Sequence, residues 1–127
     1  ASIWKLYYNG SVGGQAILGI PLVRRMKLAR GEALKAWPFE TGFKPLTEAD
    51  LAGVDVVVAE VYPSLYKAQP APGEVKDLAQ VRVTAEHFAR LDEAGKLGAA
   101  FGPGKSAAAD VVVDAETEEG WILGVEV

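Results

Sequence analysis

The chain has 127 residues, a formal net charge of −4 and a pI of about 5.0, and half of its residues are hydrophobic. This length and composition predict one globular domain and exclude a disordered chain. The acidic balance argues against nucleic-acid binding through a basic surface, although acidic nucleases offset their charge with metal ions. The absence of cysteine excludes disulfides and thiolate zinc sites, and no apolar run reaches the ~20 residues of a membrane span. We therefore expect a cytoplasmic protein without membrane association.

The first two elements that the sequence predicts are a strand over residues 3–8 and a helix over residues 11–30. The strand is rich in aromatic residues and is followed by Asn9-Gly10, a typical chain reversal. Ser11 is a suitable N-cap for the helix, and Pro21 should kink or divide it. Four cations crowd the last turns, where they complement the helix dipole, and Gly31 should end the helix.

Two further strands are expected over residues 33–39 and 54–62, with one helical turn between them at 47–51. The second strand contains Val56-Val57-Val58 and is stopped by Pro63. Such a β-branched run is typical of a strand that is buried on both faces, as in parallel sheets.

The remaining pattern predicts helices over residues 74–93 and 107–118, a short helical turn within 96–101, and an apolar tail, Trp121–Val125, that docks on the core. Alternation of strands and helices indicates an α/β fold with adjacent parallel strands, in one domain over residues 1–127. Three strands are few for a self-sufficient sheet, so we expect further strands from a longer parent chain, or a homodimer.

Glu60 is the first candidate for chemistry, because it ends the most apolar strand at the edge where open α/β sheets bind ligands. It is interpreted as a metal ligand or general base, or as a structural carboxylate that accepts hydrogen bonds. Glu40 ends the preceding strand, and if the strands are neighbours the two acids could share a divalent ion. The alternative for Glu40 is an acid in a solvated loop.

Asp110 and Asp114 lie four residues apart on one face of the last predicted helix, so a cation would relieve their repulsion. The alternative is an ordinary solvated helix face. Ser11, Gly13 and Gly14 open the first helix, where backbone N–H groups can bind a phosphate, although neither the P-loop nor the dinucleotide pattern is present. Close helix–sheet packing is the competing explanation for the glycines. His87, the single histidine, is expected to be structural.

Five segments together give the chain a family resemblance. They are Gly10–Ala16, Ile20-Pro21, Trp37-Pro38-Phe39-Glu40, Glu60-Val61-Tyr62-Pro63 and Glu119–Gly124. The chain resembles a bacterial family of ribonuclease-H-like domains, known as domain-of-unknown-function family 429. The resemblance implies that the chain is the C-terminal part of a longer ribonuclease-H-like protein, with a partial, mainly parallel sheet and flanking helices.

The resemblance also implies an acidic cluster that binds Mg²⁺ or Mn²⁺ for phosphoryl transfer. By position, Glu60 matches an acid on a later strand, and Asp114, or else Asp110, matches the acid of the last helix. The first-strand acid has no counterpart in the chain. The expected parent protein is thus a metal-dependent phosphodiester hydrolase acting on nucleic acid or a phosphorylated small molecule. The alternatives are a non-catalytic binding or assembly module, and an accessory protein in nucleotide or molybdenum-cofactor (molybdopterin-guanine dinucleotide) biosynthesis.

Overall fold

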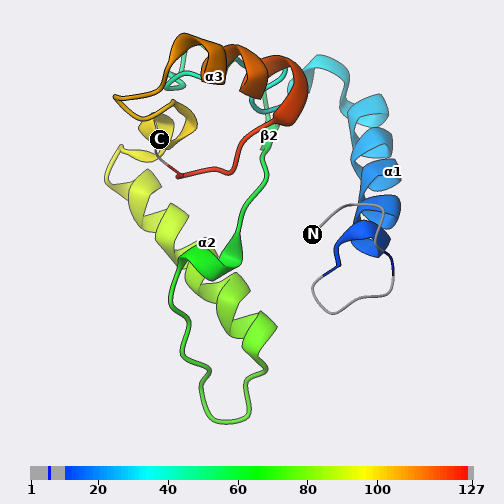
Figure 1. Cartoon of the computed structure of the whole chain (residues 1–127), viewed down its shortest axis with the longest axis vertical. Coiled ribbons are helices and arrows are strands. Elements are labelled where there is room, and N and C mark those ends of the chain that lie inside the picture. Colours follow the sequence, from blue (N-terminus) through cyan, green and yellow to red (C-terminus); the bar gives the residue numbers. More distant parts are fainter. Residues whose placement is uncertain (1–5, 7–10, 126–127) are drawn as a thin grey trace.

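The computed structural model describes Leu6 and residues 11–125 (Figure 1). Its elements in chain order are α1 (Gly13–Arg30), η1 (Gly31–Ala33), β1 (Leu34–Ala36), β2 (Val56–Val58), η2 (Pro63–Leu65), α2 (Lys76–Glu93), η3 (Leu97–Phe101), α3 (Ala109–Asp114) and η4 (Ala115–Glu119). The expected mixture of helices and parallel strands is confirmed at this level. The strand predicted over residues 3–8 falls, apart from Leu6, outside the described residues.

The sheet is built from β1 and β2, which pair in parallel with Leu34 opposite Val56. Both strands are three residues long, much shorter than the sequence predicts. Beyond β2, Glu60 forms a parallel bridge with Ile122, and the Leu123 N–H donates to the Glu60 carbonyl at 2.9 Å. The apolar tail thus docks beside the segment that follows β2, as predicted.

The helices follow the predicted order, with changes at their ends. α1 begins at Gly13 instead of Ser11, because Val12 is the N-cap and no side chain caps the helix. Pro21 lies inside α1 without dividing it, and Gly31 ends it with φ of 56°. The single helix expected over residues 107–118 is instead α3 followed by the π-helical segment η4. The extra residue in a π-helical turn rotates the side chains that follow it.

The core lies between the sheet and the C-terminal half of the chain. Its buried cluster comprises Trp37, Phe43, Leu46, Ala115 and Leu123. The Trp37 ring packs edge-on against Phe43 and Phe101, with ring centroids 5.6 and 5.7 Å apart, which is a favoured aromatic geometry. Figure 1 shows α3 and η4 across the top of the view and α1 along its right margin.

A search of the described residues for a helix long and apolar enough to cross a membrane found none. The expectation of no membrane span agrees with this finding.

A tight backbone contact at Gly98 provides a test of this packing. A Cβ atom at position 98 would lie 2.3 Å from the Leu46 carbonyl oxygen, and the Leu46 N–H donates to the Gly98 carbonyl at 2.9 Å. Because two backbones meet here, we expect Gly98→Ala to lower the free energy of unfolding by about 1–3 kcal/mol in urea denaturation.

Gly19→Ala is the matched control, since a Cβ at that helical position meets nothing within 4 Å. It should raise the free energy of unfolding by about 0.5–1 kcal/mol, because alanine favours the helix. If Gly98→Ala had the same free energy of unfolding as the unmodified chain, the close approach of the two backbones at Gly98 and Leu46 would be contradicted.

Candidate functional site

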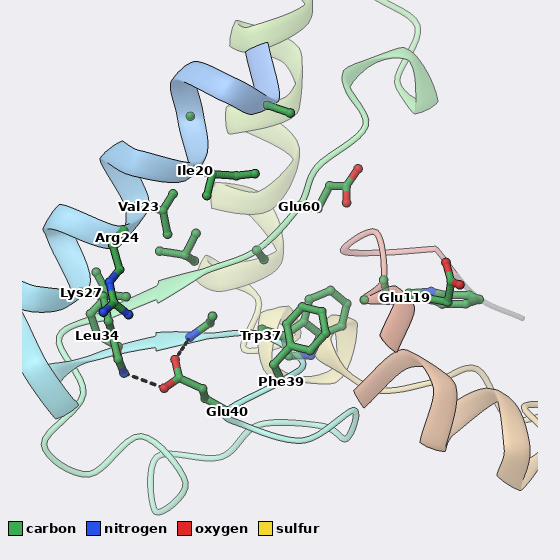
Figure 2. Close-up of a pocket in the computed structure, with 17 residues that line it drawn as sticks. Ile20, Val23, Arg24, Lys27, Leu34, Trp37, Phe39, Glu40, Glu60 and Glu119 are labelled. Atoms are coloured by element: carbon green, nitrogen blue, oxygen red, sulfur yellow. Dashed lines mark hydrogen bonds and ion pairs between the residues drawn. The ribbon is translucent and has the colours of Figure 1, made fainter. Parts of the chain in front are cut away.

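A hollow of about 660 Å³ lies between α1 and the sheet (Figure 2). Ala16, Ile20 and Val23 from α1 line one wall. The facing wall is formed by small and branched apolar side chains of the two strands, Leu34, Ala36 and Val58. Leu34 is fully buried, so the strand side of the hollow is anchored in the protein interior. The hollow is therefore a consequence of how α1 crosses the parallel strands.

Aromatic side chains close the end of the hollow that lies nearest to η4. Trp37, Phe39 and Trp121 line it there, together with Gly120. Gly120 has φ of 70°, and a Cβ atom in its place would lie 3.2 Å from the Phe39 ring. A glycine is required by both the backbone conformation and the ring, so the chain can pass close to Phe39.

Residues from all five segments that carry the family resemblance line this hollow. They are Ala16; Ile20; Trp37, Phe39 and Glu40; Glu60; and Glu119, Gly120 and Trp121. These segments are spread over more than 100 positions of the sequence. Their convergence on one hollow makes it the leading candidate for the functional site.

Two carboxylates from distant segments, Glu60 and Glu119, border the hollow. Glu60 follows β2, as predicted, and its exposed side chain is drawn beside the hollow in Figure 2. Both acids also line a second hollow of about 400 Å³, with Trp121 and Ile122. They therefore lie where the two hollows meet, and they make that region acidic.

Glu40 also lines the hollow, but on the β1 side and away from Glu60, as Figure 2 shows, although β1 and β2 are neighbours as predicted. The chain turns back after β1, with the Glu40 N–H donating to the Ala36 carbonyl at 2.8 Å. Its carboxylate accepts from the Ala36 N–H at 2.7 Å and pairs with Lys27 at 2.7 Å, as Figure 2 shows. Lys27 in turn donates to the Leu34 carbonyl at 2.7 Å. Glu40 and Lys27 thus satisfy polar groups along β1 instead of sharing an ion with Glu60.

The surroundings of Glu40 stabilise its charged form. The hydrogen bond from Lys27, and then that from the Ala36 N–H, lower the pKa of the Glu40 carboxyl below its ordinary value of 4.5. A carboxylate that already has a cation and a backbone donor has little to gain from a metal ion.

Asp110 and Asp114 lie on α3, and neither lines the two hollows that Glu60 borders. Asp110 accepts a hydrogen bond from the Val111 N–H at 3.0 Å. Both side chains are exposed, in keeping with a solvated helix face. Within Leu6 and residues 11–125, no group of three or more acidic, histidine or cysteine side chains is close enough together to hold a metal ion.

The other sequence candidates also lie apart from the hollow. Ser11, Gly13 and Gly14 are at the start of α1, and none of them lines it. His87 stacks on Tyr66, with ring centroids 4.2 Å apart, and borders a separate hollow of about 270 Å³. This agrees with the expected structural role of the histidine.

Three charged residues that line the hollow were not among the site candidates from the sequence. Arg24 and Lys27 are two of the four cations that the sequence places in the last turns of α1, and Glu119 is one of several acids in its segment. The signal for Glu119 was its place beside Gly120-Trp121, a segment that carries the resemblance. The η4 segment then places this acid, instead of Asp114, at the hollow.

Comparison of the chain with family models found no match, and neither the curated proteins nor the solved structures gave a significant one. The resemblance to ribonuclease-H-like domains therefore remains a prediction from the sequence.

The Glu40 contacts predict a pH-dependent contribution to stability. Because the folded-state pKa lies below the ordinary value, the contribution is complete above pH ~4.5 and is lost as the pH falls through the folded pKa. Glu40→Gln should lower the free energy of unfolding by about 1 kcal/mol at pH 7, a modest value because the pair is partly exposed. Urea denaturation of both proteins between pH 7 and pH 3 measures the difference. If the two proteins differed in free energy of unfolding by the same amount at every pH from 7 to 3, the lowered pKa of the Glu40 carboxyl would be contradicted.

Proposed function

We propose that this chain is a binding module, and that the hollow under α1 binds an organic ligand with an apolar body and a cationic end. The observation that carries the proposal is the hollow itself, which has apolar walls and three carboxylates at its border. Glu40 is paired with Lys27, whereas Glu60 and Glu119 lie together at the other end. Volumes of 300–1,000 Å³ are typical of small-molecule sites, which combine apolar walls with a few polar groups.

The acidic border defines the charge of the ligand. Glu60 and Glu119 line the hollow together with Trp121 and Phe39, and aromatic faces also attract cations. An ammonium or guanidinium group is therefore favoured at this end, and an anion is disfavoured. Arg24 lines the hollow from α1, away from the two acids, as Figure 2 shows for Glu60. A hydrogen-bond acceptor is favoured at that end.

Aromatic amines test the proposal directly. Tryptamine should bind, whereas indole-3-propionate, which has the same ring system with a carboxylate, should bind at least tenfold more weakly because it meets two like charges. At about 0.3 kcal/mol per non-hydrogen atom, tryptamine is expected to have a millimolar Kd. Chemical-shift titration should show the largest changes at the Trp121 indole N–H, which donates to the Val125 carbonyl.

Charge-removing variants identify the binding end. Glu60→Gln should weaken tryptamine binding and reduce the discrimination against indole-3-propionate. Glu93→Gln, a matched substitution at the end of α2 and outside the hollow, should change neither. Equal binding of the amine and the carboxylate, or shifts confined to residues outside the hollow, would refute the proposal.

A second candidate function is the metal-dependent phosphodiester hydrolase that the family resemblance implies. It is favoured by one observation, the shared position of Glu60 and the C-terminal acid Glu119 at one hollow. The described residues do not by themselves fit a catalytic metal site, because they contain no group of three suitable ligands. We therefore derive no catalytic step.

Thermal denaturation with MnCl₂ separates the two candidates. A metal site built on Glu60 predicts that millimolar Mn²⁺ raises the melting temperature and that Glu60→Gln removes the increase, because binding to the folded state stabilises it. No response to Mn²⁺ together with binding of tryptamine would favour the organic ligand.

A further inference from the structure

The hollow of about 270 Å³ that His87 borders is separate from the hollow under α1, and the two share no lining residue. This second space, the α2 hollow, is lined by residues of α2, of the segment 96–104 and of the C-terminal tail. Its volume lies just below the ~300–1,000 Å³ that is typical of sites for drug-sized molecules, so its size suits a small ion or a short molecule.

The charged side chains of the α2 hollow are all basic. His87 and Lys96 line it, and none of the described residues in its lining is acidic. Within Leu6 and residues 11–125, neither of the two forms an ion pair within 4.0 Å. Glu86, next to His87 in the sequence, pairs instead with Arg82 and Arg90 at 3.5 and 3.9 Å. In a chain of net charge −4, this lining favours a negatively charged occupant.

The backbone of the α2 hollow offers donors more than acceptors. Within residues 11–125, the Gly104 and Gly124 N–H groups donate to no backbone carbonyl, so both are available to a ligand. Five carbonyls of the lining already accept hydrogen bonds from the protein, namely those of Leu91, Lys96, Ala99, Gly104 and Val125. A ligand that accepts hydrogen bonds therefore fits the α2 hollow better than one that donates them.

Contacts outside the α2 hollow hold its walls in place. His87 stacks on Tyr66, and its ring lies edge-on to Phe88 with centroids 5.3 Å apart, so the imidazole has little freedom to turn. Gly102 is buried, and a Cβ atom in its place would lie 2.6 Å from the Pro45 side chain. The loop 102–104 is thus packed closely against the rest of the chain. Donors that are already positioned lower the entropy lost when a ligand binds.

We propose that the α2 hollow binds a small tetrahedral oxyanion, phosphate or sulfate, either free or at the end of a short ester. Lys96 supplies a point charge, while His87 and the two glycine N–H groups supply directed hydrogen bonds. A phosphate group carries about 1.5–2 negative charges at pH 7, so it gains more from this lining than a singly charged acetate. The site is independent of the ligand proposed for the hollow under α1.

Titration of the full chain with sodium phosphate, followed by amide chemical shifts, tests the proposal. NaCl at equal ionic strength is the reference. The Gly104 and Gly124 amide signals should saturate with a millimolar Kd, because Lys96 is exposed and its charge is screened. Sodium acetate should bind about threefold more weakly or less. Tighter binding of glycerol 3-phosphate than of inorganic phosphate would identify an ester as the ligand, and equal affinities would identify the free ion.

Side-chain variants test the donors. Lys96→Gln should weaken phosphate binding about fivefold or more, and Lys96→Arg should retain it, because the charge decides the affinity. Lys105→Gln is the matched control, since Lys105 is also exposed but does not line the α2 hollow, and it should bind phosphate as the unmodified chain does.

Three results would overturn the proposal. The first is that NaCl alone reproduces the shifts of Gly104 and Gly124. The second is that Lys96→Gln binds phosphate as tightly as the unmodified chain. The third is that the saturating shifts occur at Gly13 and Gly14, at the start of α1, instead of at the α2 hollow.

Discussion

The ion pair between Lys27 and Glu40 fixes α1 to the open edge of β1, and the shape of the hollow depends on it. The two side chains satisfy the Leu34 carbonyl and the Ala36 N–H, which a neighbouring strand would otherwise satisfy. Charged groups at a strand edge also oppose pairing with another chain. The C-terminal half of the helix is thereby held close to the sheet, while its N-terminal half stands over the hollow.

The hollow stays open because the large side chains around it are held by hydrogen bonds elsewhere. The Trp37 indole N–H donates to the Phe101 carbonyl at 2.8 Å, and the Trp121 indole N–H donates to the Val125 carbonyl at 2.9 Å. Neither ring can fill the space without losing its acceptor, and an unsatisfied buried N–H group is costly. The site is therefore preorganised, which lowers the entropy lost when a ligand binds.

The sequence predicted those features that depend on local pattern. The β-branched run Val56–Val58 gave a parallel strand, the position of Glu60 at its end was correct, and the apolar tail docks beside it. The position of the Glu40 carboxylate could not be predicted, because hydrogen bonds across the turn after β1, and a lysine 13 residues earlier in the sequence, decide where it lies. Asp114 was named because the family resemblance places an acid on the last helix, whereas the π-helical segment η4 is followed by Gly120 and places Glu119 at the hollow. The spacing of residues along the sequence does not predict contacts between distant segments, such as the Lys27–Glu40 pair, or a local irregularity in a helix, such as η4.

The composition of the hollow restricts what can fill it. Water gains little there, because apolar walls offer few of the hydrogen-bond partners that a buried water needs. A purely apolar occupant would displace that water but would also desolvate Glu60 and Glu119, which is costly for charged groups. A lone metal ion would neutralise the two acids and leave the apolar space unfilled. An occupant that joins an apolar body to a cation satisfies both requirements, and this is why the charge of the ligand, more than its size, determines what this site can bind.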